Sequence, residues 1–264
     1  METNILLPKN YKIIKQEGNR SVFEIENCYP GYGMTLGNAF RRVLLSSLPG
    51  AAITSVKIKG INHEFSTIPH VLEDVIQIIL NLKQVRFKLY SKEPVVLSLK
   101  VKGEKKVKAS DIKATSDIEI INQDAHIATL TDKKAELDME IEAASGLGYL
   151  PVEQRKKDKI SVGHIAIDAI FTPIKKVNYE IENMRVGERT DFDRLIIDLE
   201  TDGSINPEEA MQRAAQILVN HFDVFTGEKK DEIVPVKQAG KTEEKKKAKS
   251  PEKKSKKPKK KNKK

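Results

Sequence analysis

The residues best placed to do chemistry are three glycines, Gly31, Gly33 and Gly37, which follow a predicted strand and open a predicted helix. Nucleotide-binding proteins place a glycine-rich fingerprint at this position and hold pyrophosphate against the helix N-terminus. Here the spacing is G-x-G-x-x-x-G, with the third glycine one position late. The next strand ends at Lys59-Gly60, where no acidic residue is placed to bind the ribose hydroxyl of a nucleotide. We therefore interpret the glycines as a tight turn with positive φ angles and close helix packing.

The other candidates for chemistry form no catalytic or metal-binding pattern. The acidic pairs 73–74, 191/193 and 208–209 fall on predicted helix faces or in a turn, without a histidine or basic partner at useful spacing, so we interpret them as solvated or capping charges. A second glycine loop at 146–151 ends in a proline, which disfavours the helix that a phosphate cradle needs. The histidines lie too far apart for zinc (His63, His70, His126, His164 and His221). The sequence predicts no catalytic residue, metal site or cofactor.

The charge of the chain is unevenly distributed. The 264 residues carry a net charge of +9, but residues 241–264 alone hold 14 Lys and 3 Glu, which leaves residues 1–240 at −2.

The single cysteine, Cys28, excludes an internal disulfide and fits a reducing compartment. No apolar run approaches the roughly 18–20 residues that span a bilayer, and the start has no basic segment leading into an apolar one. We expect a cytoplasmic protein without a membrane segment.

The hydrophobic pattern predicts an α+β fold in which strands predominate. Helices are expected over 36–48, with Thr35 as N-cap, over 69–83 with Pro69 in the first turn, and over about 207–227 after Asn206. Strands are expected within 11–27, with a turn at Gly18-Asn19, and at 53–59, 85–90, 95–101, 118–121, 135–143, 161–171, 174–182 and 194–200, with a loop at 145–160. Because the helices are unevenly spaced, alternating βαβ units are not expected.

The first predicted helix has two different faces. A broad apolar face carries Leu36, Ala39, Phe40, Val43, Leu44 and Leu48. Leu45 falls on the opposite side, near Arg41 and Arg42. This leucine is either part of a second contact site, since arginine and apolar anchors suit interfaces, or an ordinary exposed residue.

The other two helices are also apolar. The second is apolar on all but one strip, which carries Gln77, so we expect protein to cover most of its sides. The last helix has one stripe with small residues early and aromatic residues late: Ala210, Ala214, Ile217, Leu218, His221, Phe222 and Phe225. Periodicity does not decide whether this stripe meets the chain's own sheet or a second copy.

Five blocks of sequence resemble the bacterial RNA polymerase alpha subunit, in family order: 31–50, 63–67, 146–151, 186–193 and 202–210. The resemblance implies a two-part amino-terminal domain: a discontinuous dimerisation subdomain (1–48 and 173–227) and an inserted mostly-β subdomain (49–172). For the remaining residues, 228–264, the composition predicts a disordered basic tail. In this family two copies pair through the first and last helices and form the platform for the beta and beta-prime subunits. It implies a non-catalytic subunit of a nucleotidyltransferase, found with the nucleoid.

The resemblance also assigns residues by position. The beta contacts would be Arg42, Leu45 and Gln77, although an acid is expected where Gln77 stands. The beta-prime contacts would be Lys83, Asp168 and Arg194. The dimer interface would hold Leu36, Phe40, Val43, Leu44, Ala214, Leu218, His221, Phe222 and Phe225.

The sequence departs from the family pattern after residue 240. The family continues into a small carboxy-terminal domain that binds promoter DNA, whereas this chain has a lysine-rich segment, so we do not transfer that function. The lysines could bind phosphates without sequence preference (Lys245, Lys246, Lys247, Lys253, Lys254, Lys256 and Lys257). The alternative is a solubilising extension. If the chain were a nucleotide-binding enzyme it would bind NAD or ATP, and if it were a nucleic-acid module its main activity would need residues 241–264.

Overall fold

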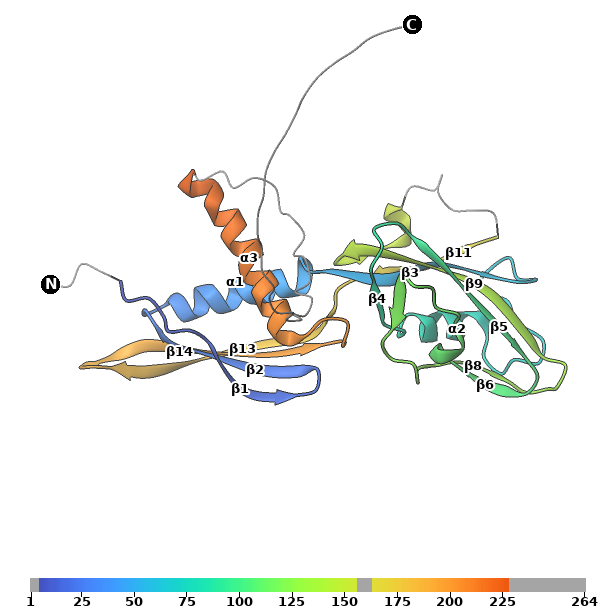
Figure 1. The fold of residues 1–264 in the computed structure, drawn as a ribbon, viewed down its shortest axis with the longest axis horizontal. Coiled ribbons are helices and arrows are strands. Elements are labelled where there is room, and N and C mark those ends of the chain that lie inside the picture. Colours follow the sequence, from blue (N-terminus) through green and yellow to red (C-terminus); the bar gives the residue numbers. More distant parts are fainter. Residues whose placement is uncertain (1–4, 156–162, 228–264) are drawn as a thin grey trace, which may run out of the picture. The chain divides into compact units, whose positions relative to one another are not determined.

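The computed structural model describes residues 5–155 and 163–227 of the chain (Figure 1). The helices are α1 (Tyr32–Ser46), α2 (Val75–Leu82) and α3 (Pro207–Thr226), with short 3-10 turns at Ala109–Asp111 and Val152–Gln154. The strands are β1 (Lys12–Glu17), β2 (Arg20–Cys28), β3 (Pro49–Ile58), β4 (Phe87–Leu89), β5 (Val95–Lys102), β6 (Lys105–Lys108), β7 (Ile118–Ile120), β8 (His126–Leu130), β9 (Glu136–Leu147), β10 (Tyr149–Leu150), β11 (Ile165–Ala166), β12 (Ala169–Ile170), β13 (Ile174–Val186) and β14 (Arg189–Thr201). The predicted α+β class is confirmed.

A four-stranded antiparallel sheet carries α1 and α3. Its strand order is β1-β2-β14-β13, and both helices lie on the same side of it (Figure 1). Alternate residues of β14 point toward the helices, so Leu195, Ile197 and Leu199 are buried. Together with Phe23, Leu44 and others they form what we call the split core, because its residues come from 23–48 and from 174–214, on either side of a long intervening segment.

The intervening segment builds a second core around a six-stranded antiparallel sheet. Its main strand order is β5-β9-β3-β4-β7, β11 also pairs with β3, and two ribbons are added, β6-β8 and β10-β12. The alternation predicted for 135–143 is confirmed, because Leu137, Met139 and Ile141 of β9 are buried. They belong to what we call the central core, a cluster of buried residues between Ile53 and Ile167 that includes one side of α2.

The starts of α1 and α2 differ from the sequence prediction, whereas the start of α3 agrees with it. Helix α1 begins at Tyr32, four residues before the predicted start, and Thr35 is not its N-cap. The hydroxyl of Thr35 instead donates to the carbonyl of Gly31, 3.3 Å away within the first turn. Helix α3 begins as predicted, because the side chain of Asn206 accepts the N–H of Glu208.

Helix α2 is shorter than predicted. It begins at Val75 with Asp74 as N-cap, so Pro69 is not in its first turn. The preceding residues extend along β8 instead: the N–H of Leu72 donates to the carbonyl of Thr129, and the N–H of Thr131 donates to the carbonyl of His70. Because of this competing pairing, the helix starts later than the apolar pattern does.

Two other predictions were wrong in detail. The segment 145–160 is not simply a loop, because β9 continues to Leu147 and β10 follows. Instead of a strand over 161–171, whose first residues lie outside the described ranges, the chain forms the separate strands β11 and β12, which pair with β3 and β10. Strands β6 and β8 were not predicted.

Candidate functional site

The side of α1 that faces away from the split core carries Arg42 and Leu45. Both are exposed, Leu45 to 38%, whereas the neighbouring Leu44 is completely buried. The buried side of α1 packs against the split core and holds the helix in place, while Arg42 and Leu45 lie on its exposed side. This is the arrangement that the helical periodicity predicted.

Helix α2 exposes more apolar surface than its sequence predicted. Gln77 is exposed, and so are Ile76 (38%) and Leu80 (53%), while Ile78 and Leu82 are buried in the central core. The expectation that protein covers most of its sides is therefore wrong for the single chain. The exposed strip lies beside the predicted beta contact, Gln77.

Glu73 attaches the start of α2 to β8. Its carboxylate accepts the N–H of Thr129 at 2.6 Å and the Thr129 hydroxyl at 3.0 Å, and lies 2.8 Å from Nε2 of His126. Burial alone would raise the pKa of Glu73, but these hydrogen bonds outweigh it and hold the pKa below its usual value. Glu73 therefore has the histidine partner that sequence spacing did not reveal.

The last helix has a buried half and an exposed half. Ala210 and Ala214 are completely buried in the split core, whereas Phe222 and Phe225 are 62% and 87% exposed. Val219 and Val224, in the same half of the helix, are exposed as well. His221 is exposed too, with Nδ1 2.7 Å from the carbonyl oxygen of Ile217.

The remaining predicted dimer residues divide into two groups. Leu36, Phe40, Val43 and Leu218 are partly buried, and the first three pack against the split core. Leu44 and Ala214 have no exposed surface in the chain. These two residues can hold α1 and α3 in place but offer no surface of their own.

Two predicted beta-prime contacts lie together. Nζ of Lys83 is 3.2 Å from Oδ2 of Asp168, while Oδ1 of Asp168 accepts the N–H of Val152 at 3.0 Å. The Val152 N–H and the Lys83 ammonium lower the pKa of Asp168 despite its partial burial. Both carboxylate oxygens are thus already engaged within the chain.

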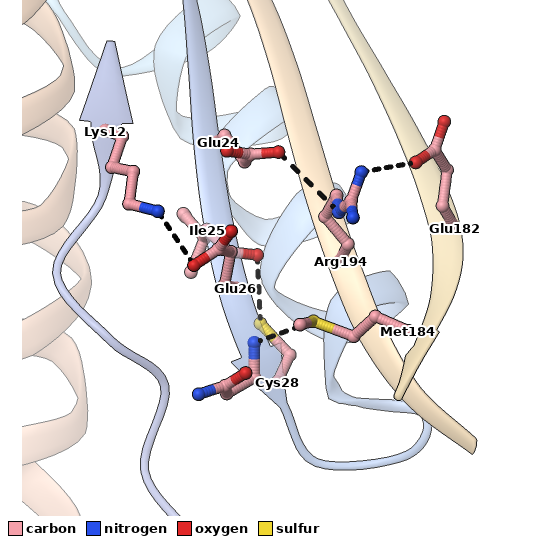
Figure 2. A network of polar contacts seen from close by, with 9 residues as sticks. Lys12, Glu24, Ile25, Glu26, Cys28, Glu182, Met184 and Arg194 are labelled. Carbon is pink, nitrogen blue, oxygen red and sulfur yellow. Dashed lines mark hydrogen bonds and ion pairs between the residues drawn. The ribbon is translucent and has the colours of Figure 1, made fainter. Parts of the chain in front are cut away.

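The third predicted beta-prime contact, Arg194, lies on the sheet face opposite to α1 and α3. Figure 2 shows its guanidinium between Glu182 of β13, 3.2 Å from Nη1, and Glu24 of β2, 3.6 Å from Nε. Beside them Lys12 of β1 pairs with Glu26 at 2.9 Å and lowers the pKa of that carboxyl group. Paired charges thus extend across all four strands of this face.

The glycine-rich start of α1 is closed by a side chain of the chain itself. Oδ2 of Asp193 accepts the N–H groups of Gly31 at 2.9 Å and Gly33 at 3.0 Å. The carboxylate lies where a nucleotide-binding helix would receive phosphate. Gly31 has φ 83°, so the predicted positive-φ turn is confirmed at that residue.

The prediction that Asp193 is a solvated or capping charge on a helix or in a turn was wrong in its location. It lies in strand β14 and is only 8% exposed. A sequence signal was present, because Asp193 shares the odd-numbered register of the buried Leu195 and Ile197. Asp191, the other acid of this pair in the sequence, is exposed and forms an ion pair with Arg189.

The described residues contain no group of three or more His, Cys, Asp or Glu side chains that could hold a metal ion. A hollow of about 270 Å³ is lined by Glu136 and Asp138, but Glu136 pairs with Lys102 and Asp138 pairs with Lys100, each at 3.2 Å.

No helix of the described residues has the length and apolar character needed to cross a membrane. The lysines predicted to bind phosphate lie outside the described residues.

Comparison with known proteins agrees with the resemblance. Residues 56–172 match the RNA polymerase Rpb3/RpoA insert domain. The DNA-directed RNA polymerase subunit alpha of Roseiflexus sp. (strain RS-1) is 50% identical over 218 residues, covering 83% of this chain and 67% of that protein. The same subunit of Symbiobacterium thermophilum is 49% identical over 223 residues, covering 84% and 70%. The chain therefore belongs to the family of DNA-directed RNA polymerase alpha subunits.

Proposed function

We propose that the chain is a non-catalytic alpha subunit that forms a homodimer and scaffolds the assembly of the beta and beta-prime subunits for transcription. The catalytic site of the polymerase would lie on those other subunits, and the complex would work in the cytoplasm at the nucleoid. The observation that carries the proposal is the exposed aromatic end of α3 on a chain of this family. The two separate cores support a division into a dimerisation subdomain (1–48 and 173–227) and an inserted subdomain (49–172).

The proposed dimer forms through α1 and α3. A second copy would cover Phe222 and Phe225, together with the exposed parts of Leu218 and His221 and the accessible edges of Leu36, Phe40 and Val43. Burying apolar surface contributes roughly 25 cal/mol per Å², so large exposed aromatic side chains are strong candidates for contact. Leu44 and Ala214 would support the helices from inside.

The dimer is tested by Phe222→Glu. An acid at this position would have to be buried without a partner in the interface, so we expect monomers, or insoluble material, in place of dimers. Val96→Glu is a matched control, because Val96 is 58% exposed but lies on β5 of the other sheet. Light scattering of Phe222→Glu that still shows a dimer would refute the placement of the interface.

The proposed beta contact combines Arg42 and Leu45 of α1 with Gln77 of α2. All three side chains are exposed, and arginine beside an apolar anchor is a frequent composition at the centre of interfaces. We expect Arg42→Ala to leave the dimer intact and to weaken capture of co-expressed beta. Arg213→Ala, on the exposed side of α3, is the control. Full capture by Arg42→Ala would remove Arg42 from the contact.

The proposed beta-prime contact uses Lys83, Asp168 and Arg194. A symmetric dimer presents each surface twice, so two different partners can bind only if they use different surfaces of the two copies. The Lys83–Asp168 pair supports a role as a preformed charged element rather than as free charges. Arg194→Ala should weaken capture of beta-prime while beta is still bound, and unchanged beta-prime capture would contradict this assignment.

A further inference from the structure

Asp193 is buried, charged and unused by the surfaces proposed above. Only 8% of its surface is exposed. A carboxylate removed from water must be compensated by hydrogen bonds or opposite charge. Its compensation comes from the start of α1.

The first turn of a helix has N–H groups without partners inside the helix, and a side chain just before the helix usually accepts one of them. In α1 that position is Gly31, which has no side chain to do so. Oδ2 of Asp193 accepts the N–H groups of Gly31 and Gly33, at 2.9 and 3.0 Å. The negative charge also lies at the positive end of the helix dipole. Asp193 thus caps α1 from a strand that lies 160 residues further along the chain.

The close fit between Asp193 and the helix backbone leaves no room for another side chain. A Cβ added to Gly33 would lie 2.9 Å from both Cβ and Oδ2 of Asp193. The strand and the helix start are therefore held at a fixed separation. The next residue, Arg194, points to the other face of the sheet and is bound there by Glu24 and Glu182, so β14 is anchored on both faces at this point.

We propose that Asp193 is a positioning residue for assembly: it fixes the start of α1 on β14 and thereby the placement of the Arg42–Leu45 surface, without touching a partner. Its effect on assembly rests on the proposed function. Its effect on the helix start does not, and can be measured separately.

The experiment compares Asp193→Ala, Asp193→Asn and the control Asp191→Ala in the full chain. Asp191 lies two residues away on the same strand but is exposed and pairs only with Arg189 among the described side chains. Losing two hydrogen bonds should speed amide hydrogen exchange at Gly31 and Gly33 by at least about tenfold in Asp193→Ala and weaken capture of beta. Asp193→Asn should restore both, because its amide oxygen can accept the same two N–H groups. Asp191→Ala should change neither.

Several results would overturn the proposal. Unchanged exchange at Gly31 and Gly33 in Asp193→Ala would do so, as would a uniform increase across α3 and β13, which marks a general loss of stability. Failure of Asp193→Asn to restore exchange would also count against it. If Asp193→Ala does not fold, Asp193→Asn decides alone: normal exchange and capture support the role, and their loss refutes it. If the unaltered chain captures no beta, the proposed function fails, while the exchange data still test the helix start.

Discussion

Single polar side chains hold the segments of this protein that carry its proposed contact surfaces. Glu73, the residue before the N-cap of α2, is an example. Its carboxylate accepts hydrogen bonds from the backbone N–H and the hydroxyl of Thr129 and contacts His126. Hydrogen bonds to a charged group contribute about 1.5–3 kcal/mol, more than most exposed ion pairs. Gln77 lies one turn further along, so we expect this attachment to contribute to its placement.

The lowered pKa of Glu73 predicts a pH dependence of stability. The folded state binds the proton more weakly than the unfolded chain, so the charged carboxylate stabilises the fold above the unfolded pKa of about 4.3, and this contribution is lost as the pH falls through the lower folded value. We expect Glu73→Gln to be less stable than the unaltered chain at pH 7, with the difference shrinking below about pH 4. Urea unfolding at several pH values measures this.

A suitable control is Glu188→Gln, at an exposed residue of the hairpin between β13 and β14. It should show little difference at any pH. A gap between Glu73→Gln and the unaltered chain that stays constant from pH 7 to pH 3 would mean that the charge of Glu73 does not contribute.

Sequence analysis found the residues that point outward more readily than the polar residues that point inward. The exposed positions of Arg42 and Leu45 follow from helical periodicity alone. Asp193 and Glu73 do not, because their partners lie on elements distant in sequence, and no local pattern encodes which N–H groups a carboxylate will meet. The odd-numbered register of Asp193 indicated burial, but it could not indicate the partner.

Among the elements, α1 illustrates how closely a helix approaches its sheet. A Cβ added at Gly37 would lie 2.6 Å from the ring of Tyr179 on β13. Replacing a helical glycine by alanine normally gains up to about 1 kcal/mol, whereas overpacking a tight contact costs about 1–3 kcal/mol. Since the ring itself packs against the split core, we expect the contact to dominate.

Gly37→Ala should therefore lower the free energy of unfolding, by roughly 1–2 kcal/mol, as measured in urea. Asn38→Ala, at the next and exposed position, supplies the comparison and should be neutral or slightly stabilising. A more stable Gly37→Ala protein would show that the sheet and the helix can separate at little cost.

Element type was predicted better than element boundaries. The strands with long alternation, such as β9 and β14, could be recognised because every second side chain enters a core. Strands β10 and β12 consist of two residues each and exist because they pair with one another, which no local window contains. At their starts α1 and α2 contact strands distant in sequence, α1 through Asp193 of β14 and α2 through β8, so the apolar pattern predicted both helices but misplaced where they begin.

At the scale of the molecule, positive charge is concentrated in one stretch of the sequence. Residues 1–240 carry a net charge of −2, while residues 241–264 carry +11. Phosphate binding by lysines releases counterions and therefore weakens steeply with salt. We propose that the tail supplies such non-specific affinity for DNA, whereas dimer formation and capture of beta do not need it.

A chain ending at residue 240 tests this separation. It should remain a dimer and capture beta, but lose most of the DNA binding that the full chain shows at low salt, as measured by fluorescence anisotropy with a labelled duplex. Loss of beta capture would contradict the scaffold proposal. DNA binding of equal strength and salt dependence in both chains would exclude a role for the lysines.

The split core has a consequence for how the protein is made. Its first part, up to Leu48, leaves the ribosome long before its second part, which begins at Ile174 and continues to Ala214. At about 5–20 residues per second, the apolar side of α1 waits on the order of ten seconds for its strands, while the central core can already close. A nascent chain paused within that interval should be a good substrate for chaperones. In a chain that continues, chaperone binding should end when the last helix emerges.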